Sequence, residues 1–264
     1  MRVIKVSGHQ LDDEAFLAGF CTAVAHLAQS EPIVVVNGGG KSIKALQEAL
    51  GLEEKKIEGL RVTDAPSLEV AEMVMSGQVN KLLVRGLQAA GLDPLGVSGV
   101  DGRLMTAIKK TKRSIQVDGE PLEADFGFVG QIVGVRADLI HKLLGLGLTP
   151  VISPISCDDQ GQHYNINADE AATAVAQALA AEQLDFVSNV PGVMRDLAEG
   201  TVIPALTVAE TKALIDEGII QGGMIPKVTA ALQAVGKGVH TARIVNLDGL
   251  RSDGGTRFKA ENKG

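Results

Sequence analysis

The sequence predicts an α/β protein, a three-layer sandwich in which a mostly parallel central sheet lies between two layers of helices. Three observations predict this fold class. Strand-like and helical stretches alternate along the whole chain, and the loops between them are short. The β-branched run at 33–36 is typical of a parallel strand that is buried on both faces. A hydrophobic content of 45% is sufficient for a sizeable core.

The elements follow from local signals in chain order. Strands at 1–6 and 33–36 flank a helix at 13–29, and a helix at 42–50 follows the second strand. A long helix at 67–90, with apolar residues at roughly helical spacing, leads into a strand at 93–97. The Asp118-Gly119 pair after an alternating run predicts a hairpin arm over 109–119. The remaining elements are strands at 129–135, 149–153, 185–188 and 242–246 and helices at 169–181, 208–217 and 226–235. After residue 246 we expect only a short tail.

Composition excludes several classes of partner. The net charge of −7 argues against a general nucleic-acid or anionic-membrane surface, and an aromatic content of 3% without Trp disfavours base stacking. Cys21 and Cys157 are too few for a disulfide scaffold or a Cys-rich zinc site. The chain shows no leader pattern, and no apolar run reaches the roughly 18 residues of a membrane span. We therefore expect a cytoplasmic, soluble protein.

A glycine-rich turn, Asn37-Gly38-Gly39-Gly40-Lys41, directly follows the strand at 33–36. Glycine amides can approach an anion closely, and the helix that follows adds its positive N-terminal end. The spacing matches neither the G-x-G-x-x-G dinucleotide fingerprint nor the Walker A loop. The turn therefore predicts either a phosphate or carboxylate site or a tight strand-to-helix connection without a ligand.

Four charged residues accompany this turn as candidates. Lys5 lies inside the first strand, beside Ser7-Gly8, and would point at the same edge of the sheet unless it is a solvated edge lysine. Lys227 follows paired glycines in a second anion-accepting turn or in a plain loop. Asp169 stands at a helix N-cap position, where it either caps the helix or holds two ammonium groups. Arg61, in a short extended segment, suits bidentate binding of a carboxylate or lies on the solvated surface.

No histidine is poised as a general base, because the five histidines are scattered and there is no Ser-His-Asp order. A carboxylate nucleophile is already ionised near neutral pH and needs no base. Phosphoryl transfer to a carboxylate requires positioning and cations around the transferring group. Two lysines, two glycine turns, one aspartate and one arginine are sufficient for that chemistry.

Taken together, the ordered segments resemble the amino acid kinase family over nearly the whole chain. The segments that carry the resemblance are Lys5-Val6-Ser7-Gly8, Asn37-Gly38-Gly39-Gly40, Gly59-Leu60-Arg61-Val62-Thr63, Asn80-Lys81, Gly127-Phe128-Val129-Gly130, Asn165-Ile166-Asn167-Ala168-Asp169 and Gly222-Gly223-Met224-Ile225-Pro226-Lys227. The resemblance implies the amino acid kinase fold. Three residues depart from the family pattern: Ser7 replaces a glycine, Asn37 replaces the usual histidine, and Asn189 stands where many members carry aspartate.

The resemblance also implies roles for individual residues. Lys5 and Lys227 would stabilise the transferring phosphoryl group, Asp169 would orient both lysines, and Gly8 would belong to the loop over the phosphates. The acylated amino acid would be held by Gly38, Gly39, Arg61 and Asn165. The nucleotide would be bound by Asn189, Val190, Pro191, Gly192, Val193, Met194, Ile219, Ile220 and Gln221. No protein ligand set for a metal is visible, so Mg²⁺ would arrive bound to ATP.

The implied reaction is ATP-dependent phosphorylation of the side-chain carboxylate of N-acetyl-L-glutamate to an acyl phosphate, in arginine biosynthesis. Ser188-Asn189-Val190-Pro191-Gly192 also resembles the branch of the family that phosphorylates aminoadipate on a small acidic carrier protein in lysine biosynthesis. The basic run Lys109, Lys110, Lys112 and Arg113 is the one part of this acidic chain that suits such a carrier, unless it is a solvated hairpin arm. A non-catalytic binding protein with the kinase fold is the third interpretation.

We expect two lobes, a substrate-binding lobe at 1–180 that includes a dimer interface and a nucleotide-binding lobe at 181–264. In the resembled kinases the helix at the place of 67–90 packs against its two-fold mate, which implies a homodimer. Members that arginine inhibits share an extra helix before the first strand, and here the strand begins at Arg2 or Val3. We therefore expect a homodimer that arginine does not inhibit.

Overall fold

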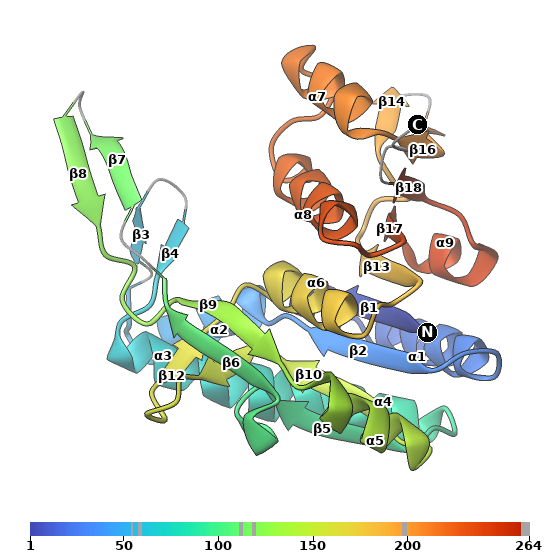
Figure 1. Ribbon diagram of the computed structural model, residues 1–264, viewed down its shortest axis with the longest axis horizontal. Helices are drawn as coiled ribbons and strands as arrows, with labels where there is room; N and C mark the ends of the chain where they lie inside the picture. Colours follow the sequence, from blue (N-terminus) through green and yellow to red (C-terminus); the bar gives the residue numbers. More distant parts are fainter. Residues whose placement is uncertain (54, 58–59, 111–112, 118–119, 197–199, 260–264) are drawn as a thin grey trace.

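The main sheet has eight strands in the order β16-β18-β17-β13-β1-β2-β10-β5 (Figure 1). The computed structural model describes residues 1–53, 55–57, 60–110, 113–117, 120–196 and 200–259. All neighbouring strands of this sheet are parallel except β17 and β18. The strands are β1 (Arg2–Val6), β2 (Ile33–Asn37), β5 (Pro94–Ser98), β10 (Thr149–Ser153), β13 (Gln183–Val187), β16 (Ala205–Leu206), β17 (Thr241–Val245) and β18 (Thr256–Lys259). The predicted mostly parallel sheet is confirmed.

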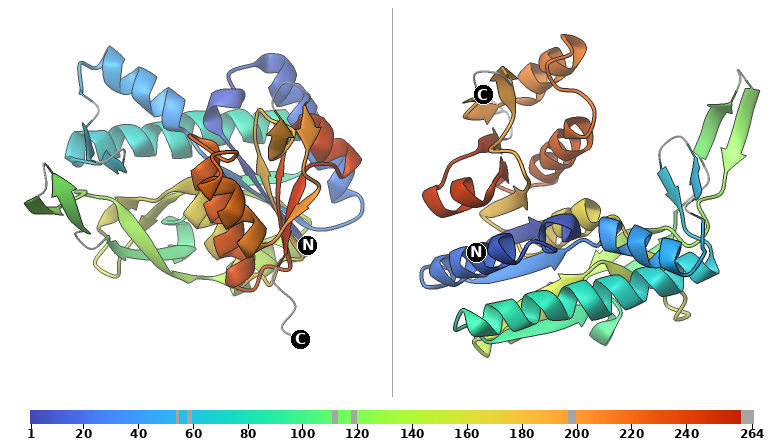
Figure 2. Two further views of the ribbon diagram at one scale, coloured as in Figure 1. Left: turned by 90° about the horizontal axis from the view of Figure 1, so that it is seen from above. Right: turned by 180° about the vertical axis from the view of Figure 1, so that it is seen from behind.

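Successive residues of the central strands belong to two different hydrophobic cores, one on each face of the sheet. Val34 and Val36 of β2 pack on the side of α5 (Ala137–Gly145), α6 (Ala168–Ala178) and α8 (Met224–Gly236). Ile33 and Val35 pack on the side of α1 (Glu14–Ala28), α3 (Ala65–Glu72) and α4 (Asn80–Ala89). Because side chains alternate along a strand, a wholly apolar strand must be covered on both faces. Figure 1 views the first side, and the right-hand view of Figure 2 shows α1 and α4 on the other.

A second sheet packs against α6, and two hairpins project from the molecule. The four-stranded sheet has the order β12-β11-β6-β9, and the hairpins β3–β4 and β7–β8 project at one end of the molecule (Figure 1). The smaller strands are β3 (Lys55–Ile57), β4 (Leu60–Val62), β6 (Met105–Lys109), β7 (Arg113–Val117), β8 (Glu120–Ala124), β9 (Gly130–Val135), β11 (Ile155–Cys157), β12 (His163–Asn165), β14 (Met194–Asp196) and β15 (Thr201–Val202). The predicted hairpin arm is confirmed, and its turn residues 118–119 lie outside the described residues.

Side-chain caps fix where several helices begin. Asp13 caps α1, Asp64 caps α3, Asn246 caps α9 (Leu247–Ser252), and Thr207 forms a capping box with Glu210. The cap of α6 is Asn167, whose side chain accepts from the backbone N–H groups of Asp169 and Glu170. The prediction that Asp169 occupies an N-cap position is therefore wrong: it lies in the first turn, with its carboxylate free for another partner. The other helical segments are η1 (Gly8–Gln10), α2 (Gly40–Ala49), η3 (Asp101–Arg103), α7 (Val208–Asp216) and α9 (Leu247–Ser252).

Two predicted elements differ in detail. The helix predicted at 67–90 is helical throughout, but a π-helical segment, η2 (Met73–Val79), separates α3 from α4. The prediction of a short tail after residue 246 is wrong, because α9 covers one face of the sheet and β18 pairs antiparallel with β17. Phe258 of β18 is fully buried, so this segment completes the core.

A buried ion pair joins β13 to β17 behind these segments. The Arg243 Nε and Nη2 atoms lie 2.8 and 2.9 Å from the two carboxylate oxygens of Asp185, and both side chains are fully buried. Arg2 of β1 also contacts Asp185, at 3.3 Å. The Arg243 Nη1 atom lies 2.7 Å from Asp253, which follows α9 in a left-handed conformation. The network therefore fixes the connection between α9 and β18.

The first prediction concerns this network. Asp185→Asn leaves Arg243 without a buried counter-charge, and we expect the free energy of unfolding to fall by about 3–5 kcal/mol. Urea unfolding measures the loss. Asp138→Asn removes an exposed partner of Arg136 and serves as the control, with a nearly unchanged midpoint. Equal midpoints for both variants would show that the buried pair contributes nothing special to stability.

Candidate active site

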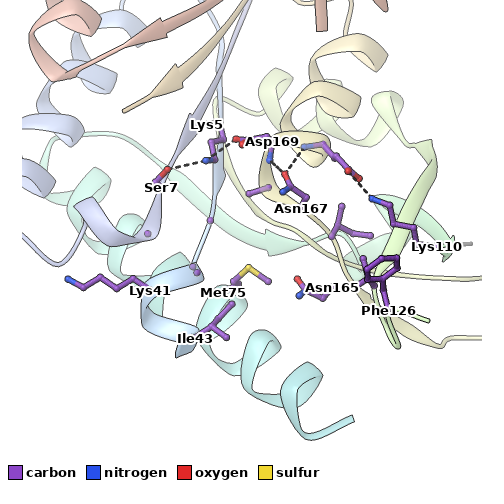
Figure 3. A pocket seen from close by; sticks show the side chains of 18 residues that line it. Lys5, Ser7, Lys41, Ile43, Met75, Lys110, Phe126, Asn165, Asn167 and Asp169 are labelled. Carbon is purple, nitrogen blue, oxygen red and sulfur yellow. Dashed lines mark hydrogen bonds and ion pairs between the residues drawn. The ribbon is translucent and has the colours of Figure 1, made fainter. Parts of the chain in front are cut away.

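A cavity of about 400 Å³ opens at the carboxyl ends of β1 and β2, where the first turn of α6 meets the glycine turn (Figure 3). Open parallel sheets place ligand sites at this edge. The predicted site residues that line it are Lys5, Gly8, Gly38, Gly39, Asn165 and Asp169. The structure thus brings together segments that are far apart in the chain.

Lys5 lies next to the end of β1 and is 9% exposed. Its Nζ atom lies 2.8 Å from Asp169 Oδ1 and donates a hydrogen bond of 3.0 Å to Ser7 Oγ. Figure 3 shows the three side chains at one end of the cavity. Ser7, which replaces a family glycine, therefore acts as a second partner of the lysine. These contacts hold the ammonium group in one place, with its charge facing the cavity.

The loop after β1 touches the loop after β2 directly. A Cβ atom on Gly8 would lie 2.8 Å from Gly39 Cα and 2.9 Å from the Gly38 carbonyl oxygen. Contacts of this length are not found for real Cβ atoms, so only glycine permits the approach. The backbone N–H of Gly38 donates to the Val6 carbonyl oxygen at 2.9 Å. The two glycine turns thus form one surface beside Lys5.

Asn37, which replaces the usual histidine, is fully buried and belongs to the support of the glycine turn. Its Nδ2 atom donates to the Met75 carbonyl oxygen at 3.0 Å, and its Oδ1 atom accepts from Asn80 Nδ2 at 3.1 Å. The same Asn80 nitrogen donates to the Val151 carbonyl oxygen at 2.9 Å. Asn37 therefore fastens the end of β2 to η2 and β10.

The opposite end of the cavity combines polar and apolar groups. Asn165 Nδ2 donates to Thr63 Oγ1 at 3.2 Å. Phe126, Val129, Ile43 and Met75 supply apolar walls. The backbone of Arg61 lies in β4, but its side chain is outside the part that the structure describes.

Lys227 lies in the first turns of α8, which packs against α6. Partial burial lowers the pKa of Lys227 from its ordinary value, the charge of Lys5 lowers it further, and Asp169 opposes this shift. The three charges are thus electrostatically coupled, although Lys227 is not among the residues that line the cavity. Its Nζ atom contacts the Gly223 carbonyl oxygen at 3.5 Å.

The predicted nucleotide residues follow β13 and α7 in the chain and lie outside the 400 Å³ cavity. The Val193 backbone N–H donates to Thr256 Oγ1 at 2.8 Å, and Thr256 Oγ1 donates to the Ile203 carbonyl oxygen at 2.6 Å. The side chains of Val193 and Ile220 are buried in the core. Ser188 Oγ donates to Asn189 Oδ1 at 3.4 Å. The predicted nucleotide set thus mixes core side chains with loop residues.

Sequence reasoning assigned no role at the site to several lining residues. These are Ser7, Lys41, Ile43, Met75, Lys110, Phe126, Val129, Ile166, Asn167, Ala168 and Glu170. The cap role of Asn167 could have been predicted, because asparagine is a preferred N-cap residue and Asn167 directly precedes the helix. Lys110 belonged to a recognised basic run, but nothing in the sequence shows that it faces the cavity.

Neither a thiol nor an imidazole competes with a carboxylate as the reacting group. Burial raises the pKa of the Cys21 thiol to about 11 and also raises the pKa of Cys157. Among the described residues that line the cavity there is no histidine. The arrangement places three lysines, each paired with a carboxylate, and two glycine turns around one cavity.

A doubly covered parallel sheet, with lysines and glycine turns at its carboxyl edge, defines an α/β protein of the phosphate-handling class. The chain belongs to the amino acid kinase family, whose family model matches residues 1–246. The resemblance found from the ordered motifs is confirmed, and with it the expected fold.

Individual relatives cover nearly the whole chain. The acetylglutamate kinase of Roseiflexus sp. is 48% identical over 255 residues, which are 96% of this chain and 92% of the relative. The acetylglutamate kinase of Chloroflexus aurantiacus is 46% identical over 257 residues, which are 97% of this chain and 95% of the relative. The crystal structure of smu.665 from Streptococcus mutans superimposes with a TM-score of 0.79 at 29% identity and covers 98% of both chains.

In the described part of this chain, no helix is both long and apolar enough to cross a membrane.

The second prediction concerns the contact between the two glycine turns. Gly8→Ala forces the loop after β1 away from the loop after β2. We expect kcat/KM for the kinase reaction to fall by about 100-fold, because such a displacement misplaces the reacting groups. Gly145→Ala, at the end of α5, is the matched control, because a Cβ atom there meets nothing within 4 Å. Steady-state kinetics with unchanged circular dichroism check the result. A normal rate for Gly8→Ala would mean that the close approach is unimportant.

Proposed function

We propose that this chain transfers the γ-phosphoryl group of ATP to the side-chain carboxylate of N-acetyl-L-glutamate, a step of arginine biosynthesis. The products are ADP and the acyl phosphate. The observation that carries the proposal is the Lys5–Asp169 pair at 2.8 Å, which faces the paired glycine turns in a cavity with apolar walls. The relatives named acetylglutamate kinase, at 46–48% identity over nearly full length, support the same substrate.

In this proposal the substrate carboxylate attacks the γ-phosphorus atom, and the bond from that atom to the bridging oxygen of ADP breaks. The carboxylate is ionised near neutral pH, so no proton has to be removed. Lys5 and Lys227 neutralise charge on the transferring oxygens, and Asp169 keeps Lys5 oriented. In this proposal Gly8 lies beside the transferring phosphoryl group, and Gly38 and Gly39 lie beside the substrate carboxylate.

The proposal assigns the substrate to residues 1–180 and the nucleotide to residues 181–264. The loop of Asn189, Val190, Pro191, Gly192, Val193 and Met194 and the segment of Ile219, Ile220 and Gln221 bind ATP in this assignment. Thr256 supports the first loop, because its hydroxyl group accepts from the Val193 backbone N–H and donates to the Ile203 carbonyl oxygen. Arg61 and Asn165 hold the acylated amino acid.

Mg²⁺ enters this reaction with ATP and, when bound, neutralises phosphate charge. Among the described residues, no group of three or more His, Cys, Asp and Glu lies together as a ligand set. The proposal therefore assigns the ion to phosphate oxygens and water, the oxygen ligands that Mg²⁺ prefers. It also includes a cytoplasmic location and a homodimer that packs through α3, η2 and α4, where Met73 is 53% exposed.

The alternative substrate, aminoadipate on an acidic carrier protein, depended on the basic run Lys109, Lys110, Lys112 and Arg113. Lys109 pairs with Asp125 and Lys110 pairs with Glu170, each at 3.0 Å, so both charges are balanced by neighbouring acids. Lys112 and the side chain of Arg113 lie outside the described residues. The names of the relatives also do not favour this alternative.

A substrate panel tests the proposed function. ADP release is measured with N-acetylglutamate, free glutamate, N-succinylglutamate and carrier-bound aminoadipate, and hydroxylamine traps the acyl phosphate. We expect the highest kcat/KM with N-acetylglutamate. A clear preference for carrier-bound aminoadipate, or no turnover with any acylated amino acid, would contradict the proposal.

The third prediction tests whether Lys5 and Lys227 take part directly in the reaction. Lys5→Ala and Lys227→Ala each remove a preorganised cation, so we expect kcat to fall on the order of 100-fold or more. Lys237→Ala, an exposed lysine at the end of α8, is the control. Near-normal turnover in either active-site variant would remove that lysine from the mechanism.

The fourth prediction uses the lowered pKa of Lys227. Its protonated fraction falls at a lower pH than that of an ordinary lysine, so kcat/KM for ATP declines as the pH rises through this pKa. Lys227→Arg keeps its charge, and we expect its alkaline decline to move to higher pH, whatever its absolute rate. Profiles between pH 7 and 10 check this. Coincident alkaline limbs for the wild type and Lys227→Arg would assign the decline to another group.

A further inference from the structure

Ser7 carries a hydroxyl group where the family pattern has a glycine, and the reaction described above makes no use of its proton. The residue directly follows β1 and lines the cavity together with Lys5 and Gly8. Its Oγ atom lies 3.0 Å from Lys5 Nζ. Figure 3 shows Ser7, Lys5 and Asp169 joined by one chain of contacts. The departure from the family pattern therefore adds a polar group beside the lysine that the proposed mechanism assigns to the phosphoryl group.

The chemistry of the two groups fixes the direction of this hydrogen bond. An ammonium group has three donors and no acceptor, so Lys5 donates and Ser7 Oγ accepts. The hydroxyl proton is thus left for another acceptor. Ser7 directly precedes η1, but its side chain makes no cap hydrogen bond to that helix. Among the residues that the structure describes, none accepts the proton of the Ser7 hydroxyl group.

Backbone contacts on both sides of Ser7 hold it beside the cavity. The Val6 carbonyl oxygen accepts from the Gly38 backbone N–H at 2.9 Å, and the Ser7 carbonyl oxygen accepts from the Gln10 backbone N–H at 3.2 Å. Gly8 touches the loop after β2, where a Cβ atom would lie 2.8 Å from Gly39 Cα. The hydroxyl group is therefore a preorganised donor, which is the kind of group that stabilises charge in a transition state.

We propose that the Ser7 hydroxyl group donates a hydrogen bond to the transferring phosphoryl group and is a catalytic residue beside Lys5. This inference rests on the proposed phosphoryl transfer, but not on which acyl group the substrate carries. Asp169 and Ser7 take two of the three Lys5 donors. The third N–H of Lys5 and the O–H of Ser7 then contact different oxygens of one phosphoryl group, over which the charge is spread. Donation by Lys5 polarises the hydroxyl group and strengthens its own hydrogen bond to the anion.

Removing the hydroxyl group gives the first test. Ser7→Ala leaves Lys5 and its pair with Asp169, and we expect kcat to fall about 10- to 100-fold, with little change in KM for either substrate. Ser7→Gly introduces the residue of the family pattern and is expected to be equally slow. Ser252→Ala removes an exposed hydroxyl group that donates to the Asp248 carbonyl oxygen at 2.8 Å, and as the control it keeps the kcat of the wild type.

A double-mutant cycle separates direct donation from an effect that passes through Lys5. If Ser7 only held Lys5 in position, removing its hydroxyl group would change nothing once Lys5 is replaced by alanine. Direct donation predicts that the double variant is slower than Lys5→Ala by about 3-fold or more. Binding of ADP with aluminium fluoride and N-acetylglutamate, measured by calorimetry, gives the same comparison without turnover, because the fluoride mimics the transferring phosphoryl group.

The outcomes separate this inference from the proposed function. Turnover of an acylated amino acid by the wild type decides the function, and its absence would overturn both. With turnover present, a lower kcat in Ser7→Ala and Ser7→Gly that persists in the Lys5→Ala background supports direct donation by Ser7. A near-normal kcat in either single variant, or a loss that disappears in the Lys5→Ala background, would overturn it.

Discussion

The ion pair between Lys5 and Asp169 is the constraint on which the rest of the site depends. It joins the first strand of the main sheet to the first turn of α6, across 164 residues of chain that include the whole second sheet. Asn167 caps α6 and so fixes where the turn that carries Asp169 begins. A lysine within an apolar strand would otherwise be costly to bury. The pair therefore stabilises the fold and aims a cation at the cavity through the same contact.

The glycine turns add a second constraint, and the departures from the family pattern show how it is maintained. Backbone amides can face an anion only where two loops approach without Cβ atoms, as Gly8 and Gly39 do. Asn37 then anchors the end of β2 to the Met75 carbonyl oxygen in η2. Ser7 gives Lys5 a second hydrogen-bond partner. Ser7 thus supports Lys5 from inside the cavity, and Asn37 supports the glycine turn from the core beside it.

The main elements could be predicted because their signals are local. The β-branched run of β2, the cap signals and the Asp118-Gly119 turn need no tertiary information, and Lys5 is conspicuous as a charge in an apolar strand. The π-helical segment η2 could not be predicted, because no local pattern in the sequence distinguishes it from the α-helix on either side. The segment of α9 and β18 was missed because a short helix and an edge strand have weak patterns. The pairing of Lys110 with Glu170 joins residues 60 positions apart, which no local pattern specifies.

Charge balance explains how an acidic chain presents an anion site. The three described lysines that line the cavity, Lys5, Lys41 and Lys110, each pair with an acid. Neighbouring ammonium groups repel one another: the charge of Lys5 lowers the pKa of Lys227, and Asp169 opposes this shift. The acids relieve it while no anion is bound. An anion that binds to one of these lysines must compete with the carboxylate that already pairs with it.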